Sequence, residues 1–127
     1  MVFVTTLDVK GLTSEEYRAV LDEMGVEIRP AADLFLHLAT KTDTGYRIVE
    51  IWNGKKGFEE FLERRLAPAA QAVNLNRHME ISITPLHNFF APRLLEIPGM
   101  IPGLPGAPDA TKRGVSAGER VPNPRVS

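Results

Sequence analysis

Cysteine is absent from this chain of 127 residues. Its absence excludes disulfide bonds, thiolate metal sites and a cysteine nucleophile. The chain also lacks an excess of charge of either sign, with a formal net charge of −1, so electrostatics favours neither a nucleic acid nor an anionic membrane. No apolar run approaches the roughly 18–20 residues of a membrane span, and residues 1–11 lack the apolar core of a signal peptide. We therefore expect a cytoplasmic protein with no nucleic-acid and no membrane partner.

Proline and glycine are scarce in most of the chain and concentrated at its end. From Ala91 onward the sequence holds seven of the ten prolines and five of the ten glycines. Proline at this density removes backbone donors and blocks both helices and central strands. The sequence therefore predicts one globular domain, residues 1–90, followed by an extended Pro/Gly-rich C-terminal arm, residues 91–127.

The arm has two open interpretations. Its composition is typical of a mobile, solvated extension. The segment "LLEIPGMIPGLP", residues 94–105, is more apolar than such an extension needs to be. That segment could instead lie along its own domain or grip a neighbouring subunit.

Hydrophobic periodicity predicts six regular elements in residues 1–90. Alternating apolar residues predict strands over residues 2–9, 33–42, 45–53 and 79–90. A first helix follows Thr13, which forms a capping box with Glu16, and stops at Gly25. A second helix starts after Asn53 or Gly54, and Pro68 should kink it or begin a new turn.

The resulting order is β-α-β-β-α-β, which is the split arrangement of a ferredoxin-like fold. We therefore predict the α+β class, with a four-stranded antiparallel sheet and both helices on one face of it. A domain of about ninety residues buries only some 60–65% of its unfolded surface, so an uncovered sheet face would be costly. We expect self-association, as a homodimer or a higher homo-oligomer.

The predicted hairpin of residues 33–42 and 45–53 separates its side chains into two unlike faces. A two-residue turn places His37 opposite Glu50 and Phe35 opposite Trp52. This mixed face combines aromatic walls with convergent polar groups, as binding sites do. The opposite face is almost purely aliphatic and carries Leu34, Leu36, Leu38, Val49 and Ile51.

Two stretches, "LFLHLAT" and "TGYRIVEIWNGKKGFEEFLERRLAPA", resemble the dimeric α/β barrel superfamily, near small actinobacterial proteins allied to antibiotic biosynthesis monooxygenases. In those proteins a strand ending in Trp runs into a helix with aromatic residues at its start and one turn later. The matching residues here are Trp52, Phe58 and Phe61, and "TPLHNFF" is similar to the end of their last strand. The resemblance covers about residues 2–90. It implies a homodimer whose sheets pack into a barrel, with a cavity between sheet and helices in each subunit.

The sequence lacks the residues that haem or metal chemistry would need. The resemblance places a Trp near Phe61 and an iron-binding His near the end of the second helix in the haem-degrading branch, where this chain has "PAAQAV". The three histidines, His37, His78 and His87, are far apart and share no short ligand motif. We expect no metal and no cofactor.

His37 is the candidate general acid or base, because imidazole titrates near neutral pH. The alternative is a space-filling His whose nitrogens are satisfied by Glu50 or by backbone. Glu50 is the second catalytic candidate and would orient His37, although a purely structural pair is equally consistent. Trp52 is interpreted as a core residue first and a pocket wall second. The other predicted pocket residues are Phe35, Tyr17, Met24, Phe61, Leu62 and His87.

Two functions remain open at this point. One is a small-molecule enzyme, or an enzyme-like protein, of the antibiotic biosynthesis monooxygenase type. It would work without a cofactor on a small aromatic or polyketide-like substrate, by oxygenation, cyclisation or isomerisation. The other is a non-catalytic dimer that binds a ligand or assembles, with the arm gripping a neighbouring subunit.

Overall fold

The computed structural model describes residues 1–104, and the chain divides into two units. The first unit is Met1–Asn88, and the second begins at Phe89, two residues before the predicted boundary. Residues 105–127, which hold most of the predicted arm, lie outside the described residues. Across the part that the structure describes, no helix is long and apolar enough to cross a membrane.

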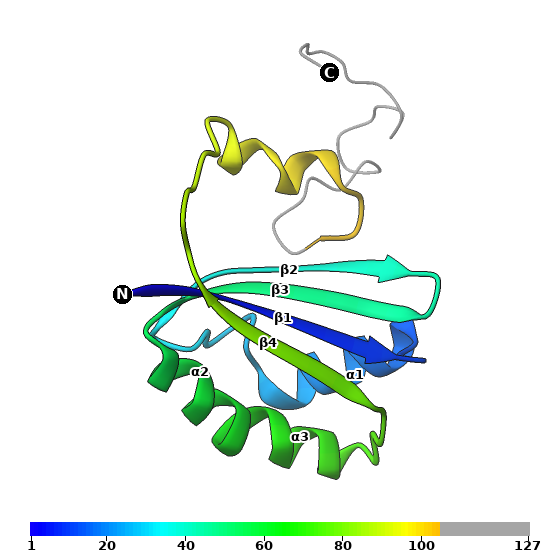
Figure 1. Ribbon diagram of the computed structural model, residues 1–127. Helices are drawn as coiled ribbons and strands as arrows, with labels where there is room; N and C mark the ends of the chain where they lie inside the picture. The colour runs from blue at the N-terminus through cyan, green and yellow to red at the C-terminus, as the bar shows by residue number, and fades with distance from the viewer. Residues whose placement is uncertain (105–127) are drawn as a thin grey trace. The chain divides into compact units, whose positions relative to one another are not determined.

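A four-stranded antiparallel sheet forms the first unit, with its helices on one face (Figure 1). The spatial order of the strands is β2-β3-β1-β4, so β1 and β3 are central. This is the ferredoxin-like α+β arrangement that the sequence predicts. The strands are β1 (Val2–Lys10), β2 (Leu34–Thr42), β3 (Gly45–Asn53) and β4 (Met79–Pro85).

Helix α1 (Ser14–Met24) begins and ends at the predicted signals. The Thr13 hydroxyl accepts from the Glu16 backbone N–H, and the Glu16 carboxylate accepts from the Thr13 N–H, both at 3.1 Å. Gly25 then adopts the left-handed conformation, with φ at 67°. The capping box and the glycine stop are therefore confirmed.

The second helical segment is one helix with a widened turn in its middle. It comprises α2 (Lys55–Phe61), the π-helical η1 (Leu62–Leu66) and α3 (Ala67–Ala72), and Gly54 is its N-cap. The Ala67 N–H donates to the Leu62 carbonyl, five residues back. Pro68 directly follows the π turn inside this continuous helix, where its missing N–H leaves one helical hydrogen bond unmade. The predicted irregularity at Pro68 is present as a π turn before it.

Strand β4 is shorter than predicted and ends at Pro85. A proline cannot donate to the sheet ladder, so the chain leaves the sheet there, and residues 86–90 are not part of the strand. The second unit contains two single 3₁₀ turns that the sequence analysis did not predict, η2 (Leu94–Glu96) and η3 (Pro98–Met100).

The register between β2 and β3 matches the prediction at its centre and departs from it at one end. His37 pairs with Glu50, as predicted, but a bulge between Leu34 and Leu36 places Leu34 opposite Trp52. The predicted pairing of Phe35 with Trp52 is therefore wrong, and Phe35 is 62% exposed. An extra residue in a bulge transfers the next side chain to the other face, so Leu34 packs against the core.

The core between the sheet and the helices is built around Trp52 and Phe58, both fully buried. The Trp52 ring lies 5.7 Å from that of Phe58 and 5.3 Å from that of Phe61, between centroids. Leu7 of β1 completes the buried cluster. The interpretation of Trp52 as a core residue is confirmed.

Candidate active site

Four side chains from α1, β2 and β3 form a continuous hydrogen-bonded chain. The Tyr17 hydroxyl lies 2.7 Å from His37 Nε2, and His37 Nδ1 lies 2.7 Å from Glu50 Oε2. The Trp52 indole N–H donates to Glu50 Oε1 at 3.1 Å. The predicted His37–Glu50 pair thus exists as a contact, extended by Tyr17 on one side and by Trp52 on the other.

Strand geometry explains three of these four positions. Glu50 and Trp52 are two residues apart on β3, so their side chains share the face that packs on the helices. His37 is the register partner of Glu50 on β2 and shares that face. Tyr17 comes from the first turn of α1, which the capping box fixes.

The carboxylate of Glu50 sets the direction of the hydrogen bonds. Glu50 is only 4% exposed, and a buried charge is tolerated only when it is well paired. Both of its oxygens are paired, with the Trp52 N–H and with His37 Nδ1. Because a carboxylate can only accept, His37 carries its proton on Nδ1. In the neutral imidazole, His37 Nε2 is then the nitrogen without a proton, and it accepts from the Tyr17 hydroxyl.

Tyr17 remains a proton donor at neutral pH. Burial raises the pKa of Tyr17 to about 12, and the carboxylates of Glu27 and Glu50 act in the same direction. Arg18 opposes this shift in the pKa. The hydroxyl therefore stays protonated and suits the acceptor that His37 presents.

Tyr17 also lies in an aromatic stack. Its ring is nearly parallel to that of Tyr46, with centroids 5.1 Å apart, and lies 6.2 Å from the His37 ring. The Tyr46 hydroxyl donates to the Ser14 hydroxyl at 3.0 Å. The His37 side chain is 27% exposed. From the Tyr17 hydroxyl, the hydrogen-bonded chain thus passes through a partly exposed imidazole to a carboxylate and an indole in the core.

Thr5 on β1 is a polar residue beside this chain that the sequence analysis did not select. It pairs with Glu50 across the sheet and is fully buried. Its hydroxyl has no hydrogen-bond partner among residues 1–104. The sequence pattern could have identified Thr5, because it alternates with Leu7 and Val9 on the buried side of β1.

The remaining predicted pocket residues do not gather around His37. Met24 and Leu62 pack against the core cluster that contains Trp52 and Phe61. Phe35 lies at the exposed bulge. His87 lies in the exposed segment after β4. Whether any of them contacts a ligand stays a prediction.

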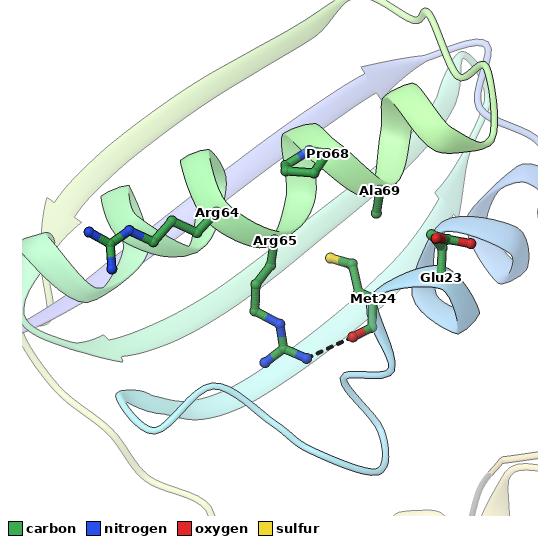
Figure 2. A pocket seen from close by; sticks show the side chains of 6 residues that line it. All are labelled: Glu23, Met24, Arg64, Arg65, Pro68 and Ala69. Atoms are coloured by element: carbon green, nitrogen blue, oxygen red, sulfur yellow. Dashed lines mark hydrogen bonds between the residues drawn. The ribbon is translucent and has the colours of Figure 1, made fainter.

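An open surface pocket of about 240 Å3 lies between the end of α1 and the helix that contains η1 and α3 (Figure 2). Arg65 reaches from η1 to donate to the Met24 carbonyl at 2.7 Å. The pocket shares only Met24 with the predicted pocket. It is lined by Glu23, Met24, Arg64, Arg65, Pro68 and Ala69.

Metal ligands do not converge in the described segment, where no three His, Asp or Glu side chains form a group that could hold an ion. The expectation of chemistry without a metal or cofactor stays a prediction.

Comparison with known proteins identifies the fold. No protein-family model and no curated protein sequence matches the chain. SnoaB, a cofactor-independent oxygenase from Streptomyces nogalater, is 16% identical over 69% of this chain and 93% of its own, with a TM-score of 0.50. A candidate antibiotic biosynthesis monooxygenase from Deinococcus radiodurans is 18% identical over 72% of this chain and 97% of its own, with a TM-score of 0.52. Identities this low establish the fold alone. The chain therefore has the ferredoxin-like fold of antibiotic biosynthesis monooxygenase-like proteins, as the resemblance predicts.

Proposed function

We propose that this protein is an enzyme of the antibiotic biosynthesis monooxygenase type that acts without a cofactor on a small aromatic or polyketide-like molecule. His37 removes a proton from the substrate, and Glu50 holds and stabilises His37. The observation that carries this proposal is the chain Tyr17–His37–Glu50–Trp52, which fixes the orientation of the imidazole and places its Nε2 at the Tyr17 hydroxyl.

The proton transfer has a clear electrostatic basis. When Nε2 takes a proton, His37 becomes an imidazolium whose Nδ1–H still donates to Glu50 Oε2. A hydrogen bond between charged groups contributes roughly 1.5–3 kcal/mol, more than a neutral one. The Trp52 N–H keeps the carboxylate in place during this change. A well-placed general base typically contributes about 10²–10⁴ in rate.

The product of this step is a substrate anion, an enolate or a phenolate. Isomerisation returns the proton to another atom, cyclisation uses the anion as an internal nucleophile, and oxygenation uses it as the reductant of molecular oxygen. All three reactions need the same base, so the site supports the proton transfer without selecting among them. The fold shared with a cofactor-independent oxygenase favours oxygenation.

The working unit in this proposal is a homodimer. Strand alternation places Val4, Leu36, Leu38, Val49 and Ile51 on the sheet face opposite the helices. Apolar side chains on one face of a small sheet are stabilised by packing against another apolar layer. Two such faces would close into one barrel and leave a candidate site in each subunit.

A second function is favoured by the composition of the arm. Leu95 is 93% exposed and Met100 is 54% exposed, and a group of exposed large apolar residues marks a contact surface. In this alternative the protein is a non-catalytic dimer whose arm grips a neighbouring subunit.

Native mass spectrometry of the protein, purified gently from its producing cells, separates the two functions. The enzyme proposal predicts a dimer that retains a small-molecule adduct, and the adduct should be lost from a His37→Asn variant. An adduct-free assembly larger than a dimer would refute the enzyme proposal and favour the assembly function. The matched control is His78→Asn, since His78 is exposed and its imidazole contacts Glu80, outside the candidate site.

A further inference from the structure

The basic nitrogen of His37 is already occupied. Its Nε2 lies 2.7 Å from the Tyr17 hydroxyl, so the lone pair that would take a substrate proton is engaged by a side chain. Tyr17 is itself a phenol, which is one of the functional groups that the proposed base would deprotonate. The position of this group on the base therefore resembles that of a bound substrate.

The ring of Tyr17 is also held as an aromatic ligand would be held. One of its faces stacks on Tyr46, at 5.1 Å between centroids and 11° between planes. The imidazole of His37 lies beyond the hydroxyl end of the ring, with centroids 6.2 Å apart and 23° between the planes. The site thus combines one hydrogen-bond acceptor with a flat aromatic platform, which suits a planar ring that carries a hydroxyl.

We infer that the Tyr17 side chain occupies the binding site for a phenolic ligand, and that the ligand binds by displacing it. This inference rests on the proposed function for the role of His37, and it adds that Tyr17 covers the base in the protein without a ligand. Tyr17 then acts as an internal stand-in that covers the base until such a compound arrives.

The exchange requires the Tyr17 side chain to leave the core cluster of Val20, Leu21 and Ala69, against which it packs. The backbone of Tyr17 is fixed by the capping box of α1, so only the side chain has to rotate. Rotation breaks the hydrogen bond to His37 and the stacking on Tyr46, and a phenolic ligand restores both. An aromatic ligand without a hydroxyl restores only the stacking and leaves His37 Nε2 without a donor.

The test removes the Tyr17 side chain by mutation and supplies the same chemical group as a free small molecule. Tyr17→Ala keeps a strong helix former in α1 and leaves room for p-cresol, which is the tyrosine side chain as a separate molecule. Toluene has the same shape without the hydroxyl. We expect p-cresol to bind Tyr17→Ala about tenfold more tightly than toluene, because of the hydrogen bond to His37. Calorimetry measures both affinities.

Two further variants assign the preference to His37. The double variant Tyr17→Ala/His37→Phe should bind p-cresol and toluene equally, since the acceptor is gone. The double variant Tyr17→Ala/Tyr46→Ala removes the aromatic platform and keeps His37, so it should bind both compounds more weakly than Tyr17→Ala and still prefer p-cresol. If Tyr17→Ala does not fold, Tyr17→Leu replaces it in the same comparison.

The result that overturns the inference is a folded Tyr17 variant that binds p-cresol no better than toluene, or no better than the wild type does. Binding that leaves the imidazole NMR signals of His37 unchanged would overturn it as well. The assay measures affinity and needs no reaction. Phenol binding at His37 without turnover of any compound would refute the proposed function and leave this inference standing. Turnover of a compound without a hydroxyl would refute this inference and leave the proposed function standing.

Discussion

Replacement of Glu50 by glutamine should move the proton of the neutral His37 imidazole from Nδ1 to Nε2. Glu50 accepts two hydrogen bonds, one from the Trp52 N–H at 3.1 Å and one from His37 Nδ1 at 2.7 Å. Glutamine has the same shape but only one acceptor oxygen, and its other terminal atom is a donor. The indole can only donate, so the amide oxygen must face Trp52 and the amide nitrogen must face His37. His37 then accepts at Nδ1 and carries its proton on Nε2, where it can no longer act as a base.

The expected cost to stability is modest. The variant exchanges two hydrogen bonds to a charged group for two neutral ones, which costs roughly 1–2 kcal/mol in the free energy of unfolding. For a domain of this size, the melting temperature falls by about 4–8 °C per kcal/mol. The expected cost to activity is larger, a loss of about 10²–10⁴ in rate, because the base is held in the wrong tautomer.

Nitrogen-15 NMR of the histidine rings measures the tautomer without any substrate. The wild type should show His37 protonated on Nδ1, and Glu50→Gln should show it protonated on Nε2. Glu59→Gln is the matched control, since Glu59 is exposed on α2, and it should leave the His37 signals unchanged. A wild-type His37 protonated on Nε2 alone, or a Glu50→Gln variant that keeps the proton on Nδ1, would refute the reasoning.

Three further predictions concern stability. Burial raises the pKa of Tyr17 to about 12, above the value of about 10 in the unfolded chain. Its contribution to stability is therefore complete below pH about 10 and lost as the pH rises towards 12. Denaturation of Tyr17→Phe and the wild type should show a loss of roughly 1–2 kcal/mol over this interval in the wild type alone, allowing for partial exposure. Thr5→Val removes a buried hydroxyl without a partner in the described structure and should stabilise the fold by about 1 kcal/mol in urea denaturation; a loss of stability would show that the hydroxyl is satisfied. Gly45→Ala should destabilise the fold by more than about 2 kcal/mol, because φ is 150° and the new Cβ would lie 2.1 Å from the Val9 carbonyl oxygen; unchanged melting would contradict this.

Features that depend on neighbours in sequence were predictable. The capping box at Thr13 and the stop at Gly25 need only residues within one helix. The pairing of His37 with Glu50 needs only a hairpin with a short turn, because both residues lie on the turn side of the bulge. The bulge at Phe35 was not predictable, since strand alternation carries no signal of an added residue. That bulge exchanged Phe35 for Leu34 on the face that carries Trp52.

Features that depend on how a helix lies on the sheet were not predictable. The contact between Tyr17 and His37 joins residues twenty positions apart. It depends on where α1 lies on the sheet, and the sequence carries no signal of that placement. The bond from Trp52 to Glu50 needed only the same-face spacing of two residues, and the sequence analysis missed it because it paired residues across strands. The orphan hydroxyl of Thr5 depends on burial by the complete fold.

The central claim is that His37 transfers a proton in a reaction on a small aromatic or polyketide-like molecule. Its most direct test incubates the wild type and His37→Asn with the small-molecule extract of the producing cells and follows every compound by mass spectrometry. Asparagine keeps a donor to Glu50 in place of Nδ1 and removes the basic nitrogen. The proposal predicts that the wild type consumes at least one aromatic or polyketide-like compound, and that a folded His37→Asn consumes it at least about 100-fold more slowly. Equal consumption by both proteins, or no consumption by the wild type, would contradict it.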